Sequence, residues 1–266
     1  MASSRSTPQH RLSSSWSPSD GLAPPSLMRG GHKQRGRRPA ASAAALHMGF
    51  IHLLCCAAAL GVLYWCVSFR GGLAWNASNK DLIFNVHPVL MVAGFIVIYS
   101  EANLAYKMVG GTKSYKKLVH LVLQGAALVL GCIGVIAAFK FHNEKGIDNL
   151  YSLHSWLGML TIVAFAVQWL VGFIVFWYPG GASYTRARMQ PWHVFLGLFI
   201  YGLALTSAET GLLEKLTFLQ SAKLISRFGT EAMFVNALGL SLVVIGPLVI
   251  WATLDHEVRV AQLIDK

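Results

Sequence analysis

The stretch LHSWLGMLTIVAFAVQWLVGFIVFW, residues 153–177, contains no Asp, Glu, Lys or Arg. As an α-helix it is long enough to cross the hydrocarbon core of a bilayer, which takes about 20 mostly apolar residues. Five other apolar runs have the same character. The six predicted spans cover residues 44–69, 82–106, 118–139, 153–177, 192–208 and 232–254. The sequence therefore predicts an all-α integral membrane protein with six transmembrane helices.

The composition of the whole chain agrees with a membrane protein. Of the 266 residues, 55% are hydrophobic and only 12% are charged, whereas a soluble domain carries roughly 25% charged residues. The six spans leave no room for a soluble catalytic domain. The net charge of +11 is high, but no folded basic surface is expected outside the bilayer. We therefore expect no binding of nucleic acid.

The chain divides into three predicted parts. Residues 1–42 are rich in Ser, Pro, Gly and basic residues and are expected to form a disordered cytoplasmic tail, although this composition is also typical of an organelle targeting peptide. Residues 43–255 form the six-helix domain, and residues 256–266 form a short cytoplasmic tail. Six spans place both termini on one side, which has 15 Lys and Arg residues against 7 on the other. The positive-inside rule makes that side the cytoplasm.

Four histidines fall within the first turns of four different predicted spans. They are His87, His120, His154 and His193, separated by 33, 34 and 39 residues. Ionisable side chains inside a membrane are costly and usually functional. Because consecutive spans run in opposite directions, His87 and His154 share the non-cytoplasmic face, and His120 and His193 share the cytoplasmic face. The sequence thus predicts two pairs of imidazoles, one near each surface.

A pair of imidazoles points to a particular cofactor. Neutral imidazole is a common ligand of transition metals, but two imidazoles fall short of the four ligands of a zinc site. A haem already supplies four equatorial nitrogens and needs only two axial ligands. We therefore expect two haem groups, whose iron binds His87 and His154 on the non-cytoplasmic side and His120 and His193 on the cytoplasmic side. Two filled axial positions favour electron transfer over oxygen chemistry.

Basic residues precede both histidines of the cytoplasmic pair. They are Lys113, Lys116, Lys117, Arg186 and Arg188. A small anionic substrate would be attracted to such a cluster, although the positive-inside rule alone also predicts basic residues in these loops. A less basic rim on the opposite side consists of Lys140, Phe141, His142 and Tyr151. His142 is a candidate substrate contact there.

Five short motifs mark the predicted spans: FNVHP at 84–88, KLVH at 117–120, LYSLHSW at 150–156, QWLVGF at 168–173 and PWH at 191–193. Together they resemble the cytochrome b561 family of transmembrane ascorbate-dependent oxidoreductases. The resemblance covers about residues 46–254. One departure concerns Lys107, which stands where the animal pattern ends in Arg, so a bidentate contact is not expected there.

The resemblance implies more than the spacing does. It implies a four-helix core bundle of helices 2–5 that holds the two haems, and electron transfer from cytoplasmic ascorbate to monodehydroascorbate or ferric chelates. The implied cytoplasmic ascorbate contacts are Lys113, Lys117 and Arg186. The implied substrate contacts on the other side are Phe141, His142 and Tyr151. Family members are usually homodimers, and the closer likeness to plant members implies a vacuolar or other endomembrane.

Two other function classes remain open from the residues alone. One is a haem-containing membrane-anchor subunit of a quinol oxidoreductase, in which two separated histidines stand on each of two helices, whereas this chain has one histidine per helix. The other is a proton or metal transporter that uses intramembrane histidines and Glu101. Such a transporter is expected to have broken helices or polar pairs near the midplane, and the sequence has neither pattern.

Overall fold

The computed structural model describes residues 38–255, with side chains from residue 45 onward. Within these residues the chain is helical without strands, and six helices are long and apolar enough to cross a membrane. The predicted fold class is therefore confirmed. The elements are α1 (Arg38–Tyr64), η1 (Trp65–Phe69), α2 (Asp81–Phe84), α3 (Val86–Met91), η2 (Val92–Ile98), α4 (Tyr99–Met108), α5 (Lys113–Lys145), α6 (Leu153–Gly172), η3 (Phe173–Trp177), α7 (Ser183–Ser221) and α8 (Thr230–Leu254), where η marks a π-helical segment.

Two helices extend well beyond the apolar runs that predicted them. The fifth span was expected at 192–208, but α7 continues to Ser221. The polar residues that interrupt the apolar run do not end the helix, because their hydroxyls are bonded within it: Thr206 donates to the Gly202 carbonyl and Thr210 to the Thr206 carbonyl. Likewise α5 runs from Lys113 to Lys145, although the apolar run covers only 118–139.

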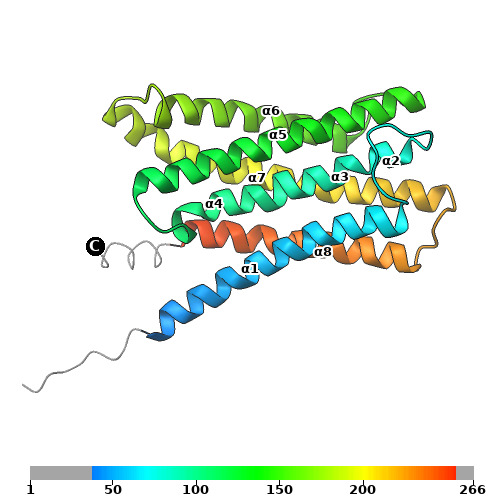
Figure 1. Ribbon diagram of the computed structural model, residues 1–266, viewed down its shortest axis with the longest axis horizontal. Helices are drawn as coiled ribbons and strands as arrows, with labels where there is room; N and C mark the ends of the chain where they lie inside the picture. Colours follow the sequence, from blue (N-terminus) through cyan, green and yellow to red (C-terminus); the bar gives the residue numbers. More distant parts are fainter. Residues whose placement is uncertain (1–37, 256–266) are drawn as a thin grey trace, which may run out of the picture. The chain divides into compact units, whose positions relative to one another are not determined.

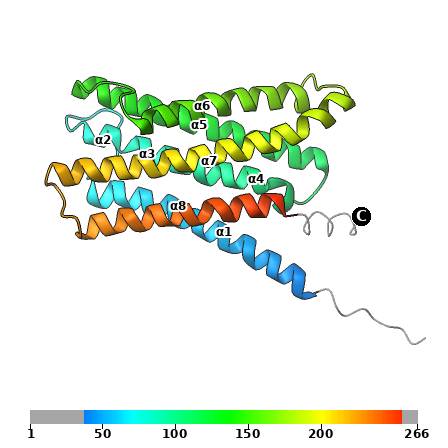
Figure 2. The same ribbon diagram turned by 180° about the vertical axis from the view of Figure 1, so that it is seen from behind.

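The two predicted tails fall largely outside the described residues. Residues 1–37 and 256–266 are not described. The last part of the predicted N-terminal tail differs from the expectation, because α1 begins at Arg38. The ends of the described chain, at the start of α1 and the end of α8, lie at the same end of the bundle (Figures 1 and 2).

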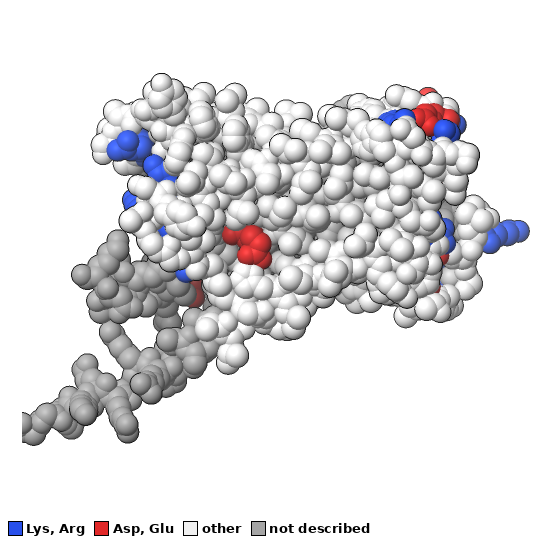
Figure 3. Space-filling view, viewed as in Figure 1, with Lys and Arg blue, Asp and Glu red and all other residues white. Residues whose placement is uncertain are grey.

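The second to fifth spans form the centre of the bundle. Helix α5 packs against α2, α3, η2 and α4, and α6 packs along α7. Helix α8 contacts α7 and α4 and lies beside α1 at the edge of the bundle (Figures 1 and 2). Lys, Arg, Asp and Glu gather at the two ends of the visible face, and the long flank between them is almost uncharged apart from one acidic patch (Figure 3). This distribution is what a bilayer-spanning bundle requires.

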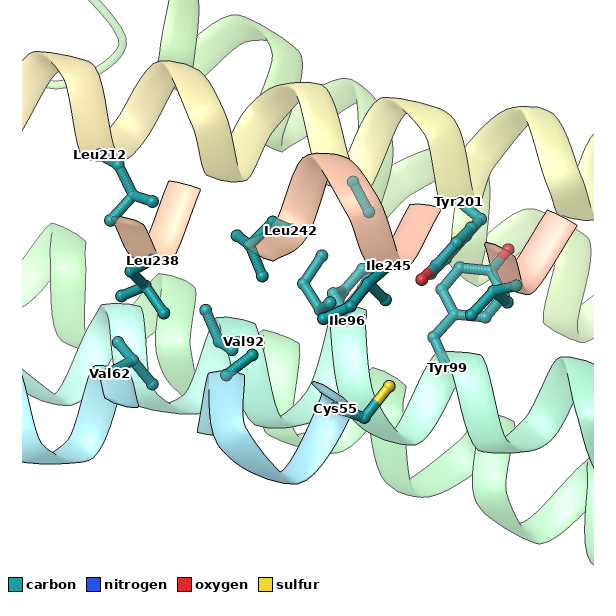
Figure 4. Close-up of a cluster of buried hydrophobic side chains, with 14 of the residues drawn as sticks. Cys55, Val62, Val92, Ile96, Tyr99, Tyr201, Leu212, Leu238, Leu242 and Ile245 are labelled. Carbon is teal, nitrogen blue, oxygen red and sulfur yellow. The ribbon is translucent and has the colours of Figure 1, made fainter. Parts of the chain in front are cut away.

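The apolar core joins the second span to α7 and α8. Ile96 of η2 lies beside Ile245 of α8, and Leu212 of α7 lies beside Leu238 of α8 (Figure 4). Hydrogen bonds join the same helices, because the hydroxyl of Tyr99 donates to the Gly197 carbonyl at 2.7 Å and the hydroxyls of Ser100 and Tyr201 are 2.7 Å apart. The same core extends to Ala127 of α5 and to Ile162 and Phe165 of α6.

Glycines bring the second span unusually close to α5. A Cβ atom added to Gly131 would lie 2.0 Å from the Phe95 ring, and one added to Gly134 would lie 2.9 Å from the Met91 sulfur. Small residues at such contacts let transmembrane helices approach closely. The close approach also brings the backbone carbonyls of α5 within reach of side chains on α3.

Candidate functional site

The two histidines expected on the non-cytoplasmic side face each other. His87 on α3 and His154 on α6 have ring centroids 6.0 Å apart, with the ring planes at 79°. His154 is the second residue of α6, so the start of that helix positions it. The Ser152 hydroxyl caps α6 by accepting from the Ser155 amide, and the Ser155 hydroxyl accepts from the Ser152 amide in return. We call His87 and His154 the outer pair.

The other two histidines form an equivalent pair at the opposite end of the bundle. His120 on α5 and His193 on α7 have ring centroids 6.2 Å apart, with the planes at 72°. Helix α5 begins two turns before His120, where the Thr112 hydroxyl accepts from the Tyr115 amide. We call His120 and His193 the inner pair. The pair lies at the end of the bundle where the described chain begins and ends.

Backbone carbonyls of neighbouring helices hold three of the four imidazoles. Nδ1 of His87 is 2.9 Å from the Gly134 oxygen, and Nδ1 of His154 is 2.9 Å from the Ser207 oxygen. Nδ1 of His120 is 2.7 Å from the oxygen of Ala102 on α4. A carbonyl oxygen only accepts, so Nδ1 carries the proton and donates. Nε2 then keeps its lone pair, which is the arrangement found in metal-binding histidines.

The fourth imidazole is held differently. Nδ1 of His193 lies 3.0 Å from the amide nitrogen of Gln168 on α6, and the same nitrogen donates to the His193 carbonyl oxygen at 2.7 Å. This amide donates to Nδ1 rather than accepting from it. For Nε2 of His193 to bind a metal, Nδ1 would have to carry the proton instead, while the Gln168 nitrogen kept its bond to the His193 carbonyl. Gln168 therefore contacts both the ring and the backbone of His193.

Glycines leave room for two of the imidazoles. A Cβ atom at Gly211 of α7 would lie 2.7 Å from Cε1 of His154, and one at Gly172 of α6 would lie 3.0 Å from Cε1 of His193. Any larger residue would push against the ring. In each pair, one histidine (His87 or His120) donates to a carbonyl of a neighbouring helix. The ring of the other (His154 or His193) packs against a glycine.

These features fit a haem at each pair. Each pair offers two nitrogens, and in residues 45–255 no group of three or more His, Cys, Asp or Glu side chains could hold a bare metal ion. A porphyrin supplies the four remaining ligands. An open cavity of about 360 Å³ lies beside His154 between α6 and α7, and its lining does not include His87. Near His120, the Oε1 atom of Gln124 is buried without a hydrogen-bond partner.

The residues expected to bind substrate on the non-cytoplasmic side are close together. The rings of Phe141 and His142 have centroids 5.7 Å apart, and those of His142 and Tyr151 are 6.4 Å apart. Phe84 joins this group to the outer pair, because its ring is 5.1 Å from Phe141 and 6.1 Å from His87. Aromatic rings thus extend from the outer pair to the surface.

Tyr151 is the outermost of these rings. Its hydroxyl donates to a Glu214 carboxylate oxygen at 3.4 Å. Burial and the neighbouring Glu214 charge raise the pKa of the Tyr151 phenol. The phenol therefore remains a neutral hydrogen-bond donor at neutral pH.

The residues expected to bind ascorbate surround the inner pair less tightly. Lys117 donates to the Phe176 carbonyl oxygen at 2.8 Å, and the Phe176 ring is 5.2 Å from His193. Arg186 in the first turn of α7 donates to the Gly181 oxygen at 3.1 Å. Lys113 is exposed at the first residue of α5. Lys117 and Arg186 thus both lie near the end of η3, which packs on the inner pair.

Several contacts of the site were not predicted. Gln168 belongs to a quoted motif, but its contact with His193 depends on packing between two helices. Nδ1 of His52 and a carboxylate oxygen of Glu101 are hydrogen-bonded at 2.6 Å between α1 and α4, with side chains 30% and 32% exposed. Glu231 is buried and accepts from Arg70 at 2.5 Å and from Trp65 at 2.8 Å. No spacing rule links partners so far apart in the sequence.

Comparisons with known proteins agree on one family. The profile of eukaryotic cytochrome b561 matches residues 86–219. Transmembrane ascorbate ferrireductase 2 of Arabidopsis thaliana is 58% identical over 189 residues, which is 71% of this chain and 82% of that protein. A probable ascorbate-specific transmembrane electron transporter 2 of Oryza sativa subsp. japonica is 55% identical, covering 76% and 85%. A lysosomal membrane ascorbate-dependent ferrireductase of Mus musculus is 43% identical, covering 72% and 80%.

The contact between Gly211 and His154 provides a test of the outer site. Gly211→Ala is expected to displace the His154 ring and weaken haem binding there, because changes around a metal ligand typically cost about 10–100-fold in affinity. Purified protein should lose the absorbance of one haem and keep that of the other. Gly202→Ala on the same helix is the matched control, because a Cβ atom there meets nothing within 4 Å. Equal haem content in both variants would contradict the geometry.

Proposed function

The chain belongs to the eukaryotic cytochrome b561 family and is an ascorbate-dependent transmembrane oxidoreductase, and from this premise we propose how it works. Two haem b groups, one held at each histidine pair, would supply the one-electron chemistry by which electrons pass from cytoplasmic ascorbate to the other side of the membrane. The acceptor there is monodehydroascorbate or a ferric chelate. One observation carries the proposal. At each end of the bundle, two imidazole rings from different helices face each other.

The haems supply one-electron redox chemistry, and the protein orients their ligands. His87 and His154 hold the non-cytoplasmic haem, and His120 and His193 hold the cytoplasmic one. The Nδ1 bonds to Gly134, Ser207 and Ala102 keep three Nε2 atoms unprotonated and fix the rings. Two imidazole nitrogens from the protein at each site would complete the ligands of a haem iron, which would favour electron transfer over oxygen binding.

On the cytoplasmic side, Lys113, Lys117 and Arg186 attract and orient the ascorbate anion. Each ascorbate anion loses one electron and one proton and leaves as monodehydroascorbate, so two ascorbates are needed for every two electrons. The Lys117 ammonium lies beside Phe176, which contacts His193. An anion bound by Lys117 is thus close to the ring that holds the cytoplasmic haem.

On the opposite side, Phe141, His142 and Tyr151 form the acceptor site. Monodehydroascorbate gains one electron and one proton to become ascorbate, or a ferric chelate gains one electron to become ferrous. The neutral Tyr151 phenol and the His142 imidazole are groups that can donate hydrogen bonds to carboxylate or enolate oxygens. Their contacts with Phe141, and through Phe84 with His87, support this assignment.

The proposal includes an orientation, a membrane and an assembly. Both termini are cytoplasmic, as the excess of Lys and Arg on that side favours. The membrane is vacuolar or another endomembrane, which the lysosomal location in the name of the mouse relative supports. The assembly is a homodimer, and the large uncharged flank of the bundle offers an apolar surface for it (Figure 3).

The pairing of the histidines is tested by optical spectroscopy. Ascorbate should reduce purified protein and produce a b-type difference spectrum. His154→Ala should remove the non-cytoplasmic component and leave the cytoplasmic one, whereas His193→Ala should do the reverse. The two components are separated by redox titration. Loss of both components in either variant, or of neither, would show that the pairs are wrongly assigned.

The cytoplasmic ascorbate site is tested in sealed vesicles loaded with ascorbate, with ferric citrate outside. Lys117→Met should raise the KM for ascorbate about 10- to 100-fold, because a hydrogen bond to a charged group contributes about 1.5–3 kcal/mol. Rates with saturating ascorbate should change less. Lys116→Met is the control, because Lys116 donates to the Tyr106 carbonyl instead. An unchanged KM for the Lys117 variant would remove this residue from the site.

A further inference from the structure

Lys215 is a cation that the proposed function leaves without a role. It lies on α7 one turn beyond Gly211, whose contact with His154 is described above. Residues four apart lie on the same face of an α-helix. Lys215 therefore projects from the face of α7 that contacts His154. It lies one turn closer than Gly211 to the non-cytoplasmic end of the bundle.

The ammonium of Lys215 lies against the side chains that surround the outer pair. Nζ is 4.1 Å from the centroid of the Phe84 ring. That ring in turn is 6.1 Å from His87 and 5.1 Å from Phe141. The ammonium thus contacts Phe84, which neighbours His87, and it extends from the helix whose Gly211 contacts His154.

Four cations at this end of the bundle have carboxylate partners, whereas the exposed Lys223 and Arg227 beyond α7 have none within 4.0 Å among the described residues. Arg70 is 2.5 Å from Glu231, Lys145 is 2.9 Å from Asp81, and Glu144 accepts from both Lys80 and Lys140. Glu214, the residue next to Lys215 in sequence, accepts instead from Tyr151. In residues 45–255, no carboxylate oxygen lies within 4.0 Å of the Lys215 nitrogen.

The position of Nζ is not that of a lysine that merely extends to water. Lysines near the ends of transmembrane helices usually direct the ammonium toward the interface. Here Lys215 is only partly exposed, and its nitrogen lies over an aromatic ring. A partly buried ammonium is stable when an anion accompanies it. The charge of Asp81 acts on Lys215, but that carboxylate is bonded to Lys145, so an anion beside the outer pair would add a direct partner.

We propose that Lys215 binds a carboxylate group beside the outer pair, on the non-cytoplasmic side of the bundle. The carboxylate has two possible sources with the same chemistry: a propionate of the haem held by His87 and His154, or the carboxylate of an anionic electron acceptor. Lys215 acts as a positioning residue in the first case and as a specificity residue in the second. The inference rests on the proposed function.

The test compares Lys215→Met and Lys215→Arg in the full-length protein, purified and in ascorbate-loaded vesicles. If the source is a haem propionate, Lys215→Met lowers the midpoint potential or the occupancy of the outer haem, because removing a positive charge stabilises the ferric form. If the source is the acceptor, the spectrum and potential stay unchanged. The KM for ferric citrate then rises several-fold, while the rate with the cation hexaammineruthenium(III) does not fall.

Lys215→Arg keeps the charge and should retain most of the wild-type behaviour in either case. Lys223→Met is the control, because Lys223 is an exposed lysine at the same end of the bundle, just beyond α7. The proposal is overturned if Lys215→Met equals wild type in spectrum, potential and KM. It is also overturned if the Met and Arg variants lose haem equally, because charge is then irrelevant.

These outcomes are separate from failure of the proposed function. If the wild-type protein contains no ascorbate-reducible haem, the proposed function fails before any Lys215 variant is measured. If the wild-type protein contains both haems and the Lys215 substitutions change neither the spectrum, the potential nor the KM, the proposed function stands and the role of Lys215 is wrong.

Discussion

Hydrogen bonds from histidine Nδ1 atoms to carbonyls of neighbouring helices determine the arrangement of the site. In a bilayer core, water is not present to satisfy a polar group, so each imidazole must find its partner within the protein. His87 reaches the Gly134 carbonyl because α3 and α5 approach closely, and the glycines at 131 and 134 permit that approach. The packing of the helices and the protonation of the rings therefore depend on each other.

The two pairs are similar but not identical. Both His87 and His154 donate to carbonyls, whereas in the inner pair only His120 does, and His193 is held by the Gln168 amide. Hydrogen bonding to a ligand changes its basicity and hence the reduction potential of the metal it binds. The unequal surroundings give a physical basis for two haems of different potential. Such a difference would define the order in which the two sites are reduced.

Much of this architecture could be predicted from the sequence, for identifiable reasons. The spacing of the four histidines follows from the length of a span plus a loop, so their facing positions were expected before the structure. The length of α7 was not, because Ser207, Glu209 and Thr210 interrupt its apolar run. The carbonyl partners were also missed, since His154 and Ser207 are 53 residues apart and any residue type supplies a carbonyl. Lys215 lay beyond the predicted end of the fifth span and for that reason received no role.

The central claim is that each histidine pair holds one haem through two protein nitrogens. It is tested most directly by measuring the haem content and the ferric spin state of the purified full-length protein together. The account predicts two haem b per chain, both six-coordinate and low-spin, because imidazole occupies both axial positions of each iron. A single haem per chain, or a high-spin ferric signal that accounts for one of two haems, would contradict it.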